Sequence, residues 1–174
     1  KLFRERSADD VLEEIELLVT KYGVKELVFM DDIFNLKPER AKGIARGIIE
    51  RGYDLKLTFP NGFRGDILDE ELVLLLKEAG MYRCMVAVES ASPRIQKVMK
   101  KRLKIEKVRH IVDFIADQGI LVHGAFMLGF PSETEEEMEA TIKWASSSSF
   151  HTAAFFRVIP FQGTELFEEV EHAG

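Results

Sequence analysis

Short apolar runs recur along this sequence about every 30 residues, and an amphipathic helical pattern occupies each gap between them. The runs predict strands at residues 27–30, 55–59, 83–88, 121–128 and 153–159. Strands that alternate with helices are typical of βαβ units, in which each helix carries the chain back so that the next strand runs parallel to the last. The sequence therefore predicts an α/β protein with a parallel sheet.

Start and stop signals bound the predicted helices. Residues 7–10 and 132–135 have the form of capping boxes, Pro38 fits a first helical turn, and Asp69 fits an N-cap. Glycines fit four helix ends, at Gly23, Gly52, Gly80 and Gly119. A chain of 174 residues is long enough to bury a core. We expect one domain over residues 1–174.

The order of these elements limits the topology. Five strands are visible, yet the first element is a helix. This order predicts a barrel or curved sheet without its first strand. A doubly wound, flavodoxin-like sheet is the alternative, and periodicity alone does not separate the two.

Composition excludes several functions. A formal charge of −6 argues against the broad basic surface that nonspecific nucleic-acid binding requires, so a nucleic-acid partner is unsupported. No apolar run approaches the roughly 20 residues of a membrane-spanning helix, and residues 1–6 lack the apolar core of a signal peptide. We therefore expect a cytoplasmic protein outside the membrane. Cys84 is the only cysteine, which excludes an internal disulfide and a metal cluster held by cysteines of this sequence.

Polar or conformationally special residues follow three of the predicted strands. They are Asp31 and Asp32, then Glu89 and Ser90, and then residues 129–133. Ligands of parallel α/β folds bind at the carboxyl ends of strands, so these positions are candidates for a binding site. If the strand continues through Asp31 and Asp32, their side chains point to opposite faces, and one lines a pocket while the other caps a loop.

Other residues have two interpretations from sequence alone. The basic run at 97–104 is either a solvated helix face or an anion contact. His123 lies within a strand and is expected to be a barrel residue with its hydrogen bonds satisfied, and Cys84 is expected to be a small buried hydrophobe. Phe155, Phe156 and Phe161 are expected in the core.

Several blocks in order resemble the radical S-adenosylmethionine (SAM) superfamily, in particular the branch often fused to a cobalamin-binding domain. The blocks cover nearly the whole chain and lie at residues 6–7, 11–15, 22–24, 29–34, 88–92, 99, 124–134 and 160–166. The resemblance implies a partial (β/α)6 TIM-like barrel lacking its first strand. It also implies an oxidoreductase-type enzyme in which a [4Fe–4S] cluster reduces SAM to methionine and a 5′-deoxyadenosyl radical, which then abstracts a hydrogen atom from the substrate. Use of cobalamin is left open.

The resemblance also implies roles for residues after the first and third predicted strands. Asp31 and Asp32 match the position that contacts the SAM amino group. Glu89 and Ser90 match the motif that meets the ribose or the methionine moiety. Lys101 lies where a basic residue pairs with the SAM carboxylate, which is a charge-assisted contact.

A second set of matching positions lies on the last two predicted strands. Phe126, Met127 and Gly129 match the motif beside the adenine, where glycine permits close approach of the backbone. Val158 and Pro160 bound a segment that provides apolar and backbone contacts to the same ring.

The sequence departs from the family pattern at three places. The cluster motif CxxxCxxC is absent, and we expect it upstream of Lys1 in a longer protein, which leaves this fragment inactive by itself. Asp31 and Asp32 replace a Gly-Gly-Glu pattern, and Ala91 and Ser132 stand where glycine is more usual.

Two alternatives to this enzyme are considered. One is a nonenzymatic α/β barrel module that binds a nucleotide or a partner protein. The other, a phosphate-binding barrel enzyme, lacks the expected glycine-rich loop before a helix. For the enzyme, the sequence predicts a small-molecule or peptide substrate of unknown identity. It also predicts self-association through an exposed barrel edge.

Overall fold

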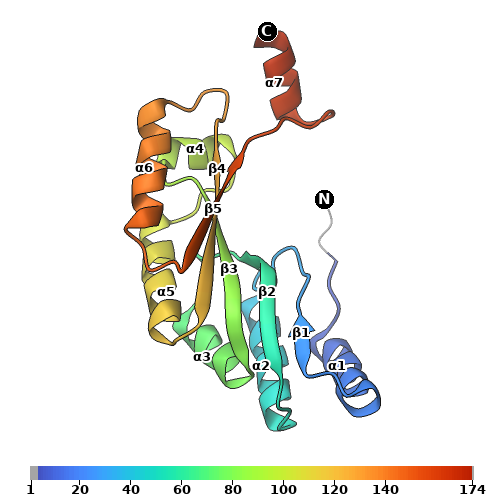
Figure 1. The fold of residues 1–174 in the computed structure, drawn as a ribbon. Coiled ribbons are helices and arrows are strands. Elements are labelled where there is room, and N and C mark those ends of the chain that lie inside the picture. The colour runs from blue at the N-terminus through green and yellow to red at the C-terminus, as the bar shows by residue number, and fades with distance from the viewer. Residues whose placement is uncertain (1–3, 174) are drawn as a thin grey trace.

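A computed structural model describes residues 4–173 of the chain (Figure 1). The other residues of the expected 1–174 domain, including part of the 1–6 segment considered for a signal peptide, lie outside it. Five parallel strands form one sheet in the order β1-β2-β3-β4-β5. They are β1 (Glu26–Val28), β2 (Lys56–Phe63), β3 (Met81–Glu89), β4 (Leu121–Leu128) and β5 (Thr152–Arg157).

Helices precede, join and follow these strands. They are α1 (Ala8–Tyr22), α2 (Pro38–Glu50), α3 (Glu70–Glu78), α4 (Pro93–Val98), α5 (Ile105–Asp117), α6 (Glu135–Ser146) and α7 (Glu165–Ala173). The predicted α/β class and parallel sheet are confirmed. Helix α7 was not predicted, because the sequence after β5 shows no further strand pattern that would indicate a helix between two strands.

The sheet has the topology of a partial barrel rather than of a doubly wound fold. A doubly wound sheet reverses its strand order, whereas these strands follow one another in sequence order without a reversal. In β3, Cys84, Val86 and Val88 are buried, whereas Arg83 is exposed and Met85 is partly exposed. Successive side chains of a strand point to opposite faces of the sheet, so one face of β3 is buried and the other is at least partly exposed to solvent. This pattern fits one wall of a barrel.

Four phenylalanines anchor the loop that follows β1. Phe59 of β2 stacks on Phe29 with 4.9 Å between ring centroids, and it also contacts Phe34 and Phe63 at 4.9 Å each. Such ring contacts add to the burial of large apolar surfaces. The cluster fixes the segment from 29 to 34, which carries Asp31 and Asp32.

The helix caps refine the predicted boundaries. Ser7 and Asp10 form the expected capping box, and Asp69 caps α3. The second capping box lies two residues later than predicted, at Thr134 and Glu137. Ser132 does not cap the helix because it contacts Arg94.

Strand β1 ends at Val28, two residues before the predicted end, so Asp31 and Asp32 lie in a loop and strand alternation does not set their directions. The prediction that Phe155, Phe156 and Phe161 lie in the core is wrong, because they are 41%, 55% and 72% exposed. Phe155 and Phe156 lie on the edge strand β5, all of whose residues are exposed, and Phe161 lies in the loop that follows it. In residues 4–173, no helix combines the length and the apolar character required to cross a membrane.

Candidate functional site

The carboxyl ends of all five strands lie at one edge of the sheet because the strands are parallel (Figure 1). Asp31 and Asp32 follow β1, Glu89 ends β3, and Gly129 follows β4. Val158 continues the pairing after β5, since its N–H donates to the Leu128 carbonyl oxygen at 2.9 Å. The predicted residues therefore share one edge, with Asp31 and Asp32 two strands away from Glu89.

Lys101 and Glu89 form an ion pair at the end of β3. The Lys101 Nζ atom lies 2.8 Å from Glu89 Oε1 and donates to the Ala87 carbonyl oxygen at 3.0 Å. The Lys101 and Glu89 side chains are 24% and 21% exposed, so both charges are partly desolvated. Each charge is stabilised by the opposite charge of its partner. Of the two interpretations of the basic run, the structure gives Lys101 an inward, paired position rather than a solvated one.

Backbone strain gathers around this pair. Glu89 has φ of 67°, and Lys100 and Arg102 have φ of 58° and 53°. These are the described non-glycine residues with positive φ, a conformation that costs roughly 1–3 kcal/mol each and clusters at functional sites. The strain supports the choice of this loop as a binding site.

Two predicted ligand residues have side chains that face the protein interior. The Ser90 hydroxyl is fully buried, lies 3.3 Å from Thr141 Oγ1 and accepts from the Ser92 N–H. Phe126 is fully buried and stacks on Phe155 with 5.1 Å between centroids. Because both residues are buried as a whole, the prediction that Ser90 and Phe126 contact a ligand is not supported by this structure.

The loop after β4 leaves space for a ligand. Gly129 has φ of 86°, and no atom lies within 4 Å of the position that a β-carbon would take. Its N–H and that of Phe130 donate to Glu133 Oε2 at 2.7 and 3.2 Å, which fixes the turn. Met127 packs beside Phe130 and Val158 in a small apolar cluster at the same end of the sheet.

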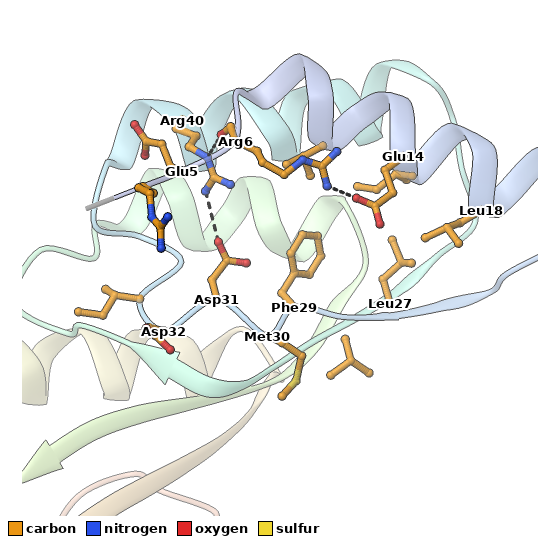
Figure 2. A pocket seen from close by; sticks show the side chains of 15 residues that line it. Glu5, Arg6, Glu14, Leu18, Leu27, Phe29, Met30, Asp31, Asp32 and Arg40 are labelled. Carbon is orange, nitrogen blue, oxygen red and sulfur yellow. Dashed lines mark hydrogen bonds and ion pairs between the residues drawn. The ribbon is translucent and has the colours of Figure 1, made fainter. Parts of the chain in front are cut away.

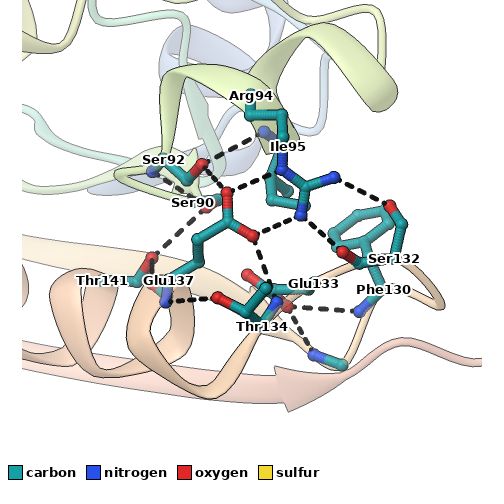
Figure 3. Close-up of polar contacts among 11 residues, drawn as sticks. Ser90, Ser92, Arg94, Ile95, Phe130, Ser132, Glu133, Thr134, Glu137 and Thr141 are labelled. Carbon is teal, nitrogen blue, oxygen red and sulfur yellow. Dashed lines mark hydrogen bonds and ion pairs between the residues drawn. The ribbon is translucent and has the colours of Figure 1, made fainter.

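An ion pair joins α4, which follows β3, to α6, which follows β4 (Figure 3). Arg94 contacts both carboxylate oxygens of Glu137, and its Nη1 donates to Ser132 Oγ at 3.3 Å. The Ser92 hydroxyl donates to Glu137 Oε1 at 2.6 Å. These bonds, first from Arg94 and then from Ser92, lower the pKa of Glu137 from 4.5 to about 2.

Protonation of Glu137 should weaken this contact in acid. Because its folded-state pKa is depressed, its stabilisation is complete above pH 4.5 and is lost as pH falls towards 2. Urea unfolding of wild type and Glu137→Gln should therefore show a difference in free energy that shrinks over that range. A difference that stays constant from neutral pH to acid would contradict the assignment.

Further hydrogen bonds tie together the loops after β1, β2 and β3. The buried Asn35 side chain donates to the Arg64 carbonyl oxygen at 2.9 Å and accepts from the Arg64 N–H at 3.0 Å. Arg64 Nη2 donates to the Lys101 carbonyl oxygen at 3.0 Å. The carboxyl-end loops are therefore bonded into one rim.

A large cavity of about 820 Å³ lies at the β1 side of this rim (Figure 2). It is lined by the segment 4–6, by α1, and by residues 27–33 and Arg40. Asp31 points towards Arg40, whose Nη1 lies 3.5 Å from Asp31 Oδ1 (Figure 2). Asp32 is exposed. The other eight predicted ligand residues are not among those that line this cavity.

The described residues do not fit an iron–sulfur cluster. Cys84 is 1% exposed, and burial raises the pKa of its thiol to about 12, so the thiolate that binds metals is not available. Within residues 4–173, no group of three or more histidine, cysteine or acidic side chains is placed to hold a metal ion. His123 Nδ1 contacts Thr152, whereas its buried Nε2 has no hydrogen-bond partner among the described residues, so the expected satisfied histidine is only half satisfied.

Sequence reasoning missed three residues that shape the site. Arg94 and Glu137 look like ordinary surface charges of two helices, and Gln96 has only the weak signal of sharing a helix face with Met99. Arg94 and Glu137 lie 43 residues apart, and Gln96 bonds to backbone groups outside its own helix, so helical periodicity reports neither role.

Comparisons with known proteins identify the family and the fold of the chain. Residues 1–145 match the family model described as the radical SAM superfamily. An uncharacterized methyltransferase of Pyrococcus horikoshii is 36% identical over 97% of this chain and 36% of its own length. The cytidylyl-2-hydroxyethylphosphonate methyltransferase of Streptomyces wedmorensis is 34% identical over 98% of the chain and 33% of its own length. The chain thus spans about a third of these relatives.

A solved structure shows the same fold. The radical SAM methyltransferase TsrM from Kitasatospora setae, with cobalamin and a [4Fe–4S] cluster bound, has a TM-score of 0.84 at 22% identity. The match covers 97% of this chain and 32% of TsrM. At this identity the likeness shows the fold alone, and it confirms the partial barrel.

Proposed function

This chain belongs to the radical SAM superfamily, and from that premise we propose that the carboxyl ends of β3 and β4 form its SAM-binding wall. The observation that carries the proposal is the Glu89–Lys101 pair on a strained loop beside the open turn at Gly129. Enzymes of this family use SAM and a [4Fe–4S] cluster. The chain is accordingly a core of a radical SAM enzyme.

The ion pair has hydrogen-bonding capacity left for a zwitterionic ligand. An ammonium has three N–H donors, and Lys101 uses two of them on Glu89 and Ala87. Glu89 accepts the lysine at Oε1, while no hydrogen bond to Oε2 is found among the described residues. The third lysine donor suits the SAM carboxylate, and Glu89 Oε2 suits the SAM amino group or a ribose hydroxyl.

The β4 side of the wall suits the nucleoside. Space beside Gly129 permits close approach of a planar ring to the backbone, and Met127 and Val158 provide apolar surface next to it. Pro160, two residues beyond Val158, completes the segment. We give Asp31 and Asp32 a smaller role in SAM binding than Glu89, because Asp31 already forms an ion pair with Arg40.

The cluster ligands have to come from outside the 174 residues, since Cys84 is the only cysteine and is buried. When bound, the cluster supplies the electron for SAM cleavage. The residues described here bind and orient SAM. The nonenzymatic module is retained as the alternative if no SAM turnover is found.

We propose methyl transfer to a small-molecule or peptide substrate as the reaction of the intact protein. Support comes from the relatives of Pyrococcus horikoshii and Streptomyces wedmorensis, which are 36% and 34% identical and are both described as methyltransferases. Cobalamin as a second cofactor is part of the same proposal. Its test is whether transfer of the methyl group requires added cobalamin.

SAM turnover by the intact protein tests the function. The intact protein, with its cluster reconstituted and a reductant added, should convert SAM to methionine and 5′-deoxyadenosine, or to S-adenosylhomocysteine where a methyl group is donated. Glu139→Ala, which removes an exposed carboxylate of α6, should leave the rate unchanged. Intact SAM after prolonged incubation of a cluster-loaded protein would reject the enzymatic function.

We also propose that the outer edge of β1 pairs with another copy of the chain. Strand β1 bonds only to β2 in the sheet, and Val28 is 53% exposed. Unpaired strand edges promote such contacts, and charged residues on the edge oppose them. Residues 1–174 should therefore sediment as concentration-dependent dimers, and Val28→Lys should shift them to monomers. Monomers at every concentration of the wild-type chain would contradict this.

A cytoplasmic location is the last part of the proposal. Its support is the single buried cysteine, since disulfides are typical of oxidising compartments and this chain forms none internally. Cell fractionation tests it, and recovery of the protein in a secreted or membrane fraction would reject it.

A further inference from the structure

Gln96 is a buried polar side chain that makes several hydrogen bonds to backbone groups around Glu89 and Lys101. It is 2% exposed and lies in the short helix α4. Its Nε2 donates to the Val88 carbonyl oxygen at 2.8 Å and to the Ser90 carbonyl oxygen at 2.6 Å. These two carbonyl groups flank Glu89 on either side.

The backbone at Glu89 forms a tight three-residue turn. The Ser90 N–H donates to the Val88 carbonyl oxygen at 2.9 Å, and Glu89 at the centre has φ of 67°. Turns of this hand are rare and strained for residues other than glycine, so they persist only where the surroundings hold them. The Gln96 amide bonds to both ends of the turn and thus holds Glu89 in this conformation.

The same residue also holds the loop that carries Lys101. The Gln96 carbonyl oxygen accepts from the N–H groups of Lys101 and Arg102 at 3.1 Å each. Its side-chain Oε1 accepts from the Leu103 N–H at 3.2 Å. Because carbonyl groups only accept and N–H groups only donate, these partners also fix which end of the amide is nitrogen.

We propose that Gln96 is a positioning residue that sets the Glu89–Lys101 pair in the geometry that binds SAM. This inference rests on the function proposed above. The Gln96 side chain is 2% exposed and bonds to the carbonyl groups on either side of Glu89 and to the Leu103 N–H, while the backbone carbonyl of the same residue, which any amino acid would supply, bonds to Lys101. The glutamine side chain therefore acts on the affinity of the site through the backbone geometry of the turn at Glu89 and of the segment that follows Lys101.

Gln96→Leu and Gln96→Glu separate this role from simple packing. Leucine keeps a similar volume and removes all three side-chain hydrogen bonds. Glutamate keeps the shape, but when ionised it places negative oxygen against the Val88 and Ser90 carbonyl groups. When protonated it regains one donor, and burial raises the pKa of such a carboxyl group.

The experiment titrates SAM into the intact, cluster-loaded protein and its variants. Gln96→Leu should weaken SAM binding roughly 10-fold to 100-fold, the loss expected when hydrogen bonds to a strained loop are removed. Ile115→Val, a core truncation in α5 away from these bonds, controls for a general loss of stability and should bind SAM as wild type does. The affinity of Gln96→Glu for SAM should increase as pH falls, whereas the affinity of the wild type should not.

The outcomes separate this inference from the proposed function. Should Glu89→Ala weaken SAM binding while Gln96→Leu binds as wild type does, the positioning role is overturned and the site stands. Should neither variant change SAM affinity, the site itself is wrong. If Gln96→Leu does not fold, Gln96→Glu decides: wild-type affinity at every pH overturns the inference.

Discussion

Replacing Glu89 with alanine should weaken SAM binding by roughly 30-fold to 100-fold in the intact protein. This is the effect of losing about 2–3 kcal/mol of charge-assisted hydrogen bonding. The variant removes the acceptor for the ligand and also leaves the partly buried Lys101 ammonium without its carboxylate. Calorimetric titration of SAM measures the change directly.

A double-mutant cycle sharpens this first prediction. Lys101→Met should also weaken binding, and the double variant Glu89→Ala with Lys101→Met should be little weaker than the worse single variant. Groups that act as one pair are not additive. Fully additive losses would mean that the two residues act independently, which the 2.8 Å separation of their charged atoms does not allow.

Replacing Gly80 with alanine should be the most destabilising single change among the described glycines. A β-carbon at Gly80 would lie 2.0 Å from the Leu55 carbonyl oxygen, and φ is 109°. The backbone has to move, which disrupts the bond from the Leu57 N–H to the Gly80 carbonyl oxygen at 2.9 Å. Strain and overpacking together predict a loss of about 3–4 kcal/mol, or roughly 10 °C in Tm.

Gly52→Ala is the matched control for this second prediction. Gly52 has φ of 64°, but nothing lies within 4 Å of a β-carbon there, so only the backbone preference is lost. That loss is roughly 1–2 kcal/mol. Urea unfolding of the two variants should show Gly80→Ala to be clearly the less stable. Equal losses would show that the close approach between Gly80, in the turn after α3, and Leu55, just before β2, does not constrain the fold.

Local sequence signals predicted most of the fold because each depends on neighbouring residues. The β4 prediction of 121–128 matches the strand, and the caps at Ser7 and Asp69 are confirmed. The errors lie where tertiary contacts decide. Thr134 replaces Ser132 as an N-cap because Arg94 contacts Ser132, and β5 is exposed because it is an edge strand.

The candidate site was less predictable than the fold. Glu89 and Gly129 share one edge of the sheet, as their positions at strand ends indicated, and Lys101 reaches Glu89 from the segment after α4. The inward directions of the Ser90 and Phe126 side chains, and the pairing of Asp31 with Arg40, depend on packing that no motif reports. Gln96 contributes through hydrogen bonds to backbone groups five to eight residues away, which sequence patterns do not reveal.

A structure of the intact protein with SAM bound tests the central claim most directly. We expect SAM to lie against Glu89, Lys101 and Gly129, with its carboxylate on the lysine and its adenine beside the β4 turn. Density for SAM within the 820 Å³ cavity between α1 and β1, away from Glu89, would contradict the account.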